Sequence, residues 1–331
     1  MVMYLPEGKS VLVVGGAGYI GSHMIHLLRD LNIRHVVLDD LSSGHREALQ
    51  GSRLIEGNCG DATLLRNVFA EHDIDAVIHF ASFIEVGASV RNPAAYYENN
   101  VCNTVTLLSE MVRADVKKFI FSSTAAVYGL PETSKIDESH RKGPINPYGR
   151  TKLMVEEILG DFEKAYGLRS VCLRYFNAAG AHPDGAIGEN HNPETHLIPL
   201  AIAAAITREK VLKVFGDDYD TRDGTCVRDY IHVCDLADAH LLALKYLNQN
   251  EASLAANLGN EAGFTVLEVI DAVSRLAGQV PYEVAARRDG DPAVLVADAT
   301  RAREVLGWTP QYTDVNDIVS HALQWYRKIA A

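Results

Sequence analysis

A short apolar segment that runs directly into a glycine-rich turn constrains the fold of this chain more than any other feature. Residues 10–14 are apolar and rich in valine, which is typical of a strand buried on both faces. Gly15, Gly18 and Gly21 follow, and apolar residues then recur at helical spacing up to Leu31. Such glycines allow a tight turn, a close approach of the backbone to a pyrophosphate, and close helix–strand packing. The pattern predicts a dinucleotide-binding strand–turn–helix unit whose helix N-terminus offers free amides to phosphate.

The next strand-like segment indicates which dinucleotide would bind. Residues 35–38 are mostly apolar and end in Asp39 and Asp40, and Asp39 lies 18 positions after Gly21. A carboxylate at about this spacing accepts hydrogen bonds from the hydroxyls of the adenosine ribose. The same charge repels a 2′-phosphate, so the sequence favours NAD over NADP.

Strand-like and helix-like segments continue to alternate as far as Asn177. The expected strands are 53–56, 76–80, 118–121 and 170–174, and the expected helices are 62–72, 96–113 and 147–166. Regular alternation of this kind predicts an α/β fold with a parallel, doubly wound sheet of the Rossmann type.

The amino-acid composition of the chain changes after residue 177. Residues 178–196 are rich in Gly, Pro, Asn and His and are expected to form a loop, followed by a helix at 197–207, a strand at 211–215 and a helix at 235–247. We therefore expect an NAD-binding domain at 1–177, joined by later segments at about 225–260. A smaller, interleaved α/β substrate domain would comprise mainly residues 178–331.

Three polar side chains are expected at the carboxyl edge of the sheet, where open α/β sheets bind ligands. Tyr148 and Lys152 lie four residues apart and so share one face of the helix at 147–166. We expect the Lys152 ammonium to lower the pKa of Tyr148, so that its phenolate can act as a general base. Thr124, after the strand at 118–121, supplies a hydroxyl donor. A Tyr-x-x-x-Lys pair alone is weak evidence for a catalytic site. The prediction rests on the glycine-rich turn and the strand–helix alternation around it.

Composition excludes several classes of partner. The net charge of −12 argues against nucleic acid or an anionic membrane surface as the main partner, and no apolar run approaches the ~18 residues of a membrane helix. The five cysteines form no CxxC pair and residues 1–10 contain no signal-peptide core, so we expect a reduced, cytoplasmic protein. His182, His191 and His196 show no tight ligand spacing, and we expect no metal site.

Several longer phrases identify a resemblance. They are Gly-Gly-Ala-Gly-Tyr-Ile-Gly-Ser-His (15–23), Val-Ile-His-Phe-Ala (77–81), Phe-Ser-Ser-Thr-Ala-Ala-Val-Tyr-Gly (121–129), Leu-Arg-Tyr-Phe-Asn (173–177) and Val-Arg-Asp-Tyr-Ile-His-Val (227–233). With them the chain resembles the extended short-chain dehydrogenases/reductases, and most specifically the UDP-glucose 4-epimerase family, from Val11 to about Trp325. The resemblance implies reversible 4-epimerisation of UDP-glucose and UDP-galactose through a 4-keto intermediate, with tightly bound NAD, in galactose metabolism. It also implies a homodimer that packs through helices 96–113 and 148–166.

The resemblance also implies roles for individual residues. Tyr148 would take the proton from the sugar 4-hydroxyl, Thr124 would hydrogen-bond the reacting oxygen, and Lys152 would bind the nicotinamide ribose. The NAD contacts would be the three glycines with Tyr19, Ile20, Asp39, Asp40, Asn58, Cys59, Phe80, Ala81, Ser82, Asn99, Lys152 and Phe176. The UDP-sugar contacts would be Asn177, Leu197, Lys213, Phe215, Arg228, Arg288, Asp291 and Leu295, besides Thr124. By residue type alone, Arg228 and Arg288 could equally form surface ion pairs.

Four positions depart from the family pattern. Asn58 stands where an Asp is common, Ile84 where a Lys is often present, and His196 where an Asn usually lies near the uracil. Leu295 stands where some members have a bulky Tyr at the back of the sugar pocket. The smaller side chain leads to the hypothesis that N-acetylated UDP-sugars are also accepted, with an ordinary core leucine as the alternative.

Other functions remain open at this point. Another nucleotide-sugar epimerase, acting for example on UDP-xylose or UDP-arabinose, would share the same motifs. A 4,6-dehydratase or a related decarboxylase needs an acid beside the Ser/Thr, whereas Ala125 and Ala126 follow Thr124. A non-catalytic NAD-binding regulator is disfavoured because Thr124, Tyr148 and Lys152 are all present. A net dehydrogenase would consume added NAD, which an epimerase does not.

Overall fold

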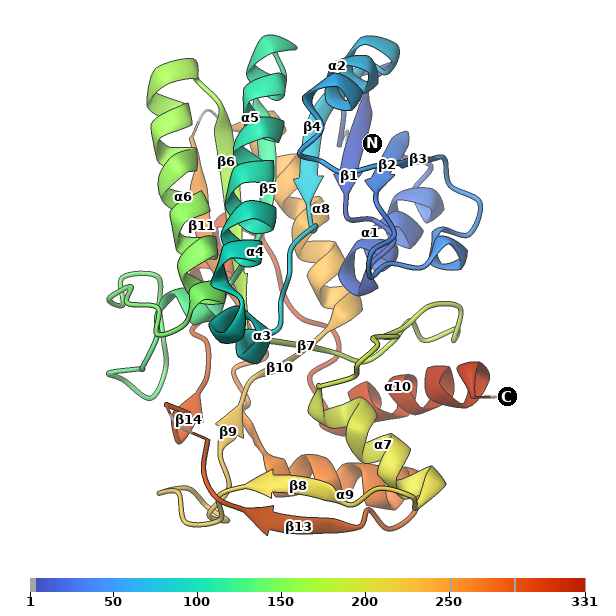
Figure 1. The fold of residues 1–331 in the computed structure, drawn as a ribbon, viewed down its shortest axis with the longest axis vertical. Coiled ribbons are helices and arrows are strands. Elements are labelled where there is room, and N and C mark those ends of the chain that lie inside the picture. The colour runs from blue at the N-terminus through green and yellow to red at the C-terminus, as the bar shows by residue number, and fades with distance from the viewer. Residues whose placement is uncertain (1–3, 251, 289, 331) are drawn as a thin grey trace.

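A seven-stranded parallel sheet forms the larger part of the structure, a computed structural model that describes residues 4–250, 252–288 and 290–330 (Figure 1). Each neighbouring pair of strands is parallel, which confirms the expected sheet type. In spatial order the strands are β11 (Leu254–Leu258), β6 (Arg169–Tyr175), β5 (Lys118–Thr124), β4 (Ile74–His79), β1 (Ser10–Val14), β2 (His35–Asp39) and β3 (Leu54–Glu56). Six of these strands match the sequence prediction within three residues at each end, and β11 was not predicted.

Both faces of the large sheet are covered by helices, as a doubly wound sheet requires. Val11 and Val13 of β1 pack with α1 (Tyr19–Asp30) and α8 (Val233–Gln249) on one face. Leu12 and Val14 pack on the other face. The helices there are α2 (Ala62–Glu71), α5 (Asn103–Arg113) and α6 (Pro147–Tyr166). Because successive strand residues point to opposite faces, the uninterrupted apolar run of β1 is explained by burial on both sides.

The expected single helix at 96–113 is a composite. A short helix α4 (Pro93–Tyr97) continues through a π-helical turn (Glu98–Cys102) into α5. The smaller helix α3 (Val86–Arg91) precedes it. In the π-helical segment the side chain of Asn100 is buried, and its amide donates to Phe83 O at 3.0 Å and to Thr151 Oγ1 at 3.1 Å. This contact ties the segment after β4 to helix α6.

The remaining elements form a smaller unit below the carboxyl edge of the sheet in Figure 1. Its core is apolar side chains of three helices, α7 (Leu197–Thr207), α9 (Val266–Ala277) and α10 (Val315–Ile329). Short strands pair as β13 (Tyr282–Ala285) with β8 (Leu212–Phe215), β10 (Tyr230–His232) with β7 (Asn177–Ala179), and β12 (Phe264–Thr265) with β9 (Val227–Arg228) and β14 (Val294–Leu295). Short 3₁₀ or π turns lie at Arg46–Leu49, Ala125–Val127 and Ala302–Leu306. Among the described residues, no helix is both long enough and apolar enough to cross a bilayer.

Candidate active site

In the glycine-rich turn after β1, the backbone of Gly15 lies close to the backbone at the end of β4 and at the start of α1. Gly15 has φ +80°, and a Cβ there would lie 2.4 Å from the backbone nitrogen of Ala81. A Cβ on Gly21 would lie 2.2 Å from the carbonyl oxygen of Gly15. Only glycine fits at these two positions, because any side chain would push the turn away from the end of β4 or from helix α1. The turn therefore forms the tight cradle that the sequence predicted at the N-terminus of α1.

Asp39 lies at the end of β2, next to this cradle. Its Oδ2 accepts a hydrogen bond from the Ala17 backbone N–H at 2.8 Å, and its Oδ1 accepts from that of Leu41 at 2.9 Å. Burial raises the pKa of Asp39, and these two hydrogen bonds act in the opposite direction. Each oxygen keeps a free lone pair for a ribose hydroxyl. The Asn58 amide donates to Asp40 Oδ2 at 3.0 Å, so Asn58 and Asp40 form one polar wall.

The start of helix α6 places Tyr148 beside Thr124. Asn146 caps the helix by accepting from the Gly149 N–H at 2.8 Å, and Pro147 occupies the first turn, where its missing donor carries no penalty. A Cβ on Gly149 would lie 2.5 Å from Ala126 O, so the glycine lets the helix approach the end of β5 closely. The Thr124 hydroxyl then reaches the phenol of Tyr148, and their hydrogen bond favours the phenolate. The predicted proximity of these two residues is confirmed.

The expected lowering of the pKa of Tyr148 by Lys152 is wrong. Burial raises the pKa of Tyr148 to about 12, with the Thr124 hydrogen bond only partly opposing it. The Lys152 ammonium donates to Ser82 Oγ and to Ser122 O, both at 2.8 Å. Burial lowers the pKa of Lys152 to about 7. Burial disfavours both the phenolate of Tyr148 and the ammonium of Lys152. The sequence prediction failed because the spacing of two residues along a helix indicates neither their burial nor the other hydrogen-bond partners of the ammonium.

A buried ion pair fixes the same face of α6 to the sheet. Glu156 lies one turn after Lys152, and its carboxylate accepts from Arg174 Nε at 2.8 Å and from Arg174 Nη2 at 2.6 Å. Ser123 Oγ donates to the same carboxylate at 2.6 Å. Sequence reasoning missed this support, although the spacing of Tyr148, Lys152 and Glu156 at i, i+4 and i+8 was a usable signal. The pair fixes the rotation of α6, and thereby aims Tyr148 and Lys152 at the sheet edge.

A cavity of about 1020 Å³ connects these groups at the carboxyl edge of the sheet. Its walls include the catalytic candidates Thr124, Tyr148 and Lys152. They also include every NAD-contact candidate, namely Gly15, Gly18, Tyr19, Ile20, Gly21, Asp39, Asp40, Asn58, Cys59, Phe80, Ala81, Ser82, Asn99 and Phe176. The elongated set, from the carboxylates after β2 to the phenol of Tyr148, suits a dinucleotide: a glycine cradle for phosphates, acceptors for ribose hydroxyls and apolar walls for rings.

The UDP-sugar candidates divide into two groups. Asn177 and Leu295 line the cavity, as do two of the positions that depart from the family pattern, Ile84 and His196. Six candidates lie outside the cavity wall: Leu197, Lys213, Phe215, Arg228, Arg288 and Asp291.

Four of the six outlying candidates form two contacts in the smaller unit. Arg228 pairs with Asp291, and the Arg288 guanidinium lies 4.0 Å from the centre of the Phe215 ring. β14 pairs with β9 in register Leu295–Arg228, so this group adjoins the sugar end of the cavity through Leu295.

The loop between β7 and α7 also lines the cavity, with side chains that sequence reasoning set aside. Glu189, His191 and His196 all face it. Burial opposes the charged form of both imidazoles, but hydrogen bonds to Glu189 and Glu194 raise the pKa of His191 to about 9 and that of His196 to about 10. The four side chains therefore form one polar cluster.

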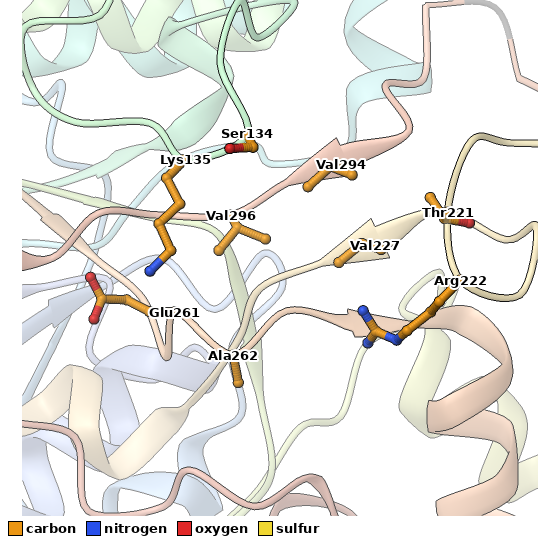
Figure 2. Close-up of a pocket in the computed structure, with 9 residues that line it drawn as sticks. All are labelled: Ser134, Lys135, Thr221, Arg222, Val227, Glu261, Ala262, Val294 and Val296. Carbon is orange, nitrogen blue, oxygen red and sulfur yellow. The ribbon is translucent and has the colours of Figure 1, made fainter.

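A second, smaller cavity of about 320 Å³ lies between the β9–β14 ladder and neighbouring loops (Figure 2). Two of its charged side chains already have partners: Arg222 donates to Glu268 at 2.6 Å, and Glu261 accepts from Arg303 at 2.6 Å. It carries none of the motifs that point to catalysis, so the large cavity is the candidate active site.

Comparisons with known proteins agree with this assignment. Residues 11–259 match the model of the NAD dependent epimerase/dehydratase family. The UDP-glucose 4-epimerase of Rhizobium leguminosarum bv. trifolii is 53% identical over 97% of this chain and 98% of its own length. A UDP-glucose 4-epimerase from Brucella ovis, solved in complex with NAD, superposes with a TM-score of 0.94 at 48% identity, over 96% of this chain and 98% of that one. The UDP-Glc/GlcNAc 4-epimerase from Campylobacter jejuni gives 0.86 at 42% identity, over 97% and 100%.

Proposed function

This chain belongs to the NAD-dependent epimerase/dehydratase family, and on that premise we propose that it interconverts UDP-glucose and UDP-galactose at C4 through a 4-keto sugar. One observation carries the proposal: Thr124, Tyr148 and Lys152 converge on the cavity whose other end is the glycine cradle and Asp39. When bound, NAD supplies the acceptor and donor of the C4 hydride.

The side chains of the protein supply the proton transfer. Tyr148 Oη takes the proton of the sugar 4-hydroxyl and returns it to the same oxygen, O4, when the keto group is reduced on its opposite face. The single O–H of Thr124 donates either to the phenol of Tyr148, which favours the phenolate, or to the reacting sugar oxygen, which favours its ionised form. Burial raises the pKa of Tyr148, and we propose that Lys152, one helical turn away, favours the phenolate when it is protonated; its pKa of about 7 leaves it about half charged at neutral pH.

The remaining assignments follow from the same premise. Residues 1–177 with about 225–260 bind NAD, and residues 178–331 mainly bind the UDP-sugar. Arg228 and Arg288 neutralise the diphosphate, and the nearby Asp291, Lys213, Phe215 and Leu197 enclose the nucleotide. This assignment requires the Arg228–Asp291 pair to open or to share its charge with the phosphates. Arg228→Met should raise KM for UDP-galactose at least tenfold with a smaller change in kcat, whereas equal changes in both would contradict the role.

A direct experiment separates the epimerase from its rivals. The purified protein is denatured, the released nucleotide is identified by mass spectrometry, and UDP-galactose turnover is followed by ion-exchange chromatography. We expect NAD and UDP-glucose. A deoxygenated keto product would indicate a dehydratase, which the alanines at 125 and 126 already disfavour, since neither carries a proton to complete an elimination. Turnover of UDP-xylose alone would move the function to a pentose epimerase.

A second candidate substrate class rests on Leu295. This side chain lines the cavity and packs with Phe176 against a small apolar cluster at the sugar end. A leucine leaves more room there than a tyrosine, so an acetamido group at C2 fits. Leu295→Tyr should lower the ratio of UDP-N-acetylgalactosamine to UDP-galactose turnover by about 10-fold or more, the scale of hydrophobic pocket discrimination. Leu295→Met, which keeps the volume, is the control; an unchanged ratio in the tyrosine variant contradicts the hypothesis.

We also propose a cytoplasmic homodimer that packs through the helices at 96–113 and 148–166. The five cysteines are unpaired, as a reducing compartment requires. Light scattering coupled to gel filtration measures the mass in solution. A value near 72 kDa, twice the 36.2 kDa chain, is expected, and a monomeric mass would contradict the dimer.

A further inference from the structure

Four metal-ligating side chains converge in the loop between β7 and α7. Glu189, His191, Glu194 and His196 come from eight consecutive residues, and one ligand atom from each lies within 4.8 Å of the others. The sequence predicted no metal at His182, His191 and His196, because no tight ligand spacing accompanies them. The convergence of the four ligating residues is produced by the loop's own turns and is visible only in the fold.

The loop that carries the cluster is held from both sides. Trp325 of α10 donates its indole N–H to Glu189 O at 2.8 Å, and His45 Nε2 lies 3.0 Å from Asn190 O. Glu194 Oε1 accepts from the backbone N–H of Thr195 at 2.7 Å and of His196 at 2.8 Å. One carboxylate is thus oriented by backbone amides, which is the kind of outer contact that fixes metal ligands.

The distances match those between ligands of a small ion. His196 Nδ1 lies 2.7 Å from Glu189 Oε1 and 3.1 Å from Glu194 Oε1. His191 Nδ1 lies 3.1 Å from Glu189 Oε1 and 3.8 Å from Glu194 Oε2. In a tetrahedral zinc site with bonds of about 2.0–2.1 Å, neighbouring ligand atoms are about 3.3 Å apart. The four observed distances bracket this value.

The hydrogen-bonding needs of the cluster also favour an ion at its centre. Each imidazole presents the same nitrogen, Nδ1, to oxygens of two different carboxylates, yet one N–H points along one direction only. The Glu189 side chain is only 7% exposed, so water does little to solvate its charge. A divalent cation would displace the Nδ1 proton of each imidazole, so that two neutral imidazoles and two carboxylates around it leave no net charge.

We propose that Glu189, His191, Glu194 and His196 bind one divalent transition-metal ion, with Zn²⁺ as the best match to two imidazole and two carboxylate ligands. The ion ties the loop to the wall of the active-site cavity, where the His191 ring packs edge-on against Tyr19 with centres 6.1 Å apart. Its role is structural, since the four protein ligands complete the tetrahedron and leave no position for a reacting group.

The chain contains a natural control for this proposal. His26, His182 and Asp184 form the other metal-like group among the described residues, but it offers only three ligands. Asp184 is 51% exposed, and His26 Nε2 lies 3.9 Å from it. We expect this second group to bind zinc far more weakly.

The test uses full-length protein without a polyhistidine tag, carrying its own nucleotide. Protein is treated with EDTA, incubated with ZnCl₂ and desalted, and the zinc is counted by plasma mass spectrometry. We expect about one zinc per chain in the wild type and in His182→Ala, and less than a tenth of that in His191→Ala and Glu189→Gln. Zinc should raise the melting temperature of the first two proteins only.

Cobalt provides a second readout that does not depend on stability. Co²⁺ in a tetrahedral N/O site absorbs visible light through d–d transitions, so the wild type should turn coloured and Glu194→Gln should not. Near-ultraviolet circular dichroism checks that each variant is folded. Wild-type protein without zinc after desalting, or equal zinc in the wild type and the three cluster variants, would overturn the proposal.

Discussion

Removing the negative charge of Glu156 while keeping its shape should destabilise the protein strongly. The Glu156 and Arg174 side chains are 5% and 2% exposed, so their charges are solvated mainly by each other. Glu156→Gln leaves the buried guanidinium without its counter-charge, at a cost of about 3–5 kcal/mol. At about 2.1 cal/mol/K per residue, the unfolding entropy of 331 residues is about 0.7 kcal/mol/K. The expected fall in melting temperature is therefore about 4–7 °C.

A double-mutant cycle tests whether the pair, rather than packing, is responsible. Arg174→Met alone should also destabilise, because it strands the Glu156 carboxylate. The double variant Glu156→Gln/Arg174→Met removes both charges and should be more stable than the sum of the two single effects by at least about 2 kcal/mol. Calorimetry of all four proteins at one nucleotide concentration supplies the numbers. Additive losses would refute the account of the pair.

The same variant should change the pH dependence of catalysis. Burial lowers the pKa of Lys152, and the charge of Glu156 raises it in part. Without that charge the pKa of Lys152 falls further, so the ammonium is lost at a lower pH. The alkaline decline of kcat should begin at lower pH in Glu156→Gln than in the wild type. An unchanged profile would show that Lys152 does not act through its charge.

Four further substitutions test the site and the fold. Tyr148→Phe should lower kcat by about 10²–10⁴-fold, the range for loss of a general base, and leave the nucleotide content unchanged by absorbance at 260 and 280 nm. Gly15→Ala places a Cβ 2.4 Å from Ala81 N and should abolish nucleotide retention, whereas Gly160→Ala in α6, with nothing within 4 Å, should add about 1 kcal/mol of stability in urea unfolding. Burial raises the pKa of Asp229 to about 6 in the folded protein, from about 3.8 in the unfolded chain. The protonated carboxyl therefore stabilises the folded state fully below about pH 4, and this contribution is lost as the pH rises through about 6. The free energy of unfolding of the wild type, measured relative to Asp229→Asn, should therefore fall by up to about 3 kcal/mol between about pH 4 and 7, and a constant difference would contradict the assignment.

The large sheet was predictable because each of six strands is marked by its own sequence. Strand β1 is apolar from Val11 to Val14 because both of its faces are buried. Gly15 and Gly21 follow it because the backbone contacts there leave no room for a side chain. The seventh strand, β11, was missed because Leu254–Leu258 is short, contains two alanines and an asparagine, and follows β6 only after a long excursion through the smaller unit. Its pairing is a long-range contact that local patterns do not encode.

The site was predictable where parallel strands and one helix position it. Thr124, Tyr148 and the glycine turn meet because carboxyl ends of parallel strands share one edge of the sheet. The protonation of Tyr148 and Lys152 was not predictable, because it depends on burial and on Ser82 and Ser122, which are distant in sequence. The cluster of Glu189, His191, Glu194 and His196 was missed for a different reason. Its members are close in sequence, but they are brought together by irregular backbone that the sequence pattern does not predict.

Proton NMR of the purified protein with UDP-galactose, and with no NAD added, tests the central claim most directly. Anomeric signals of UDP-glucose should grow to a fixed ratio without any keto product, because the cofactor stays bound and is restored in each turnover. No turnover, or turnover only after NAD is added, would contradict a self-restoring 4-epimerase.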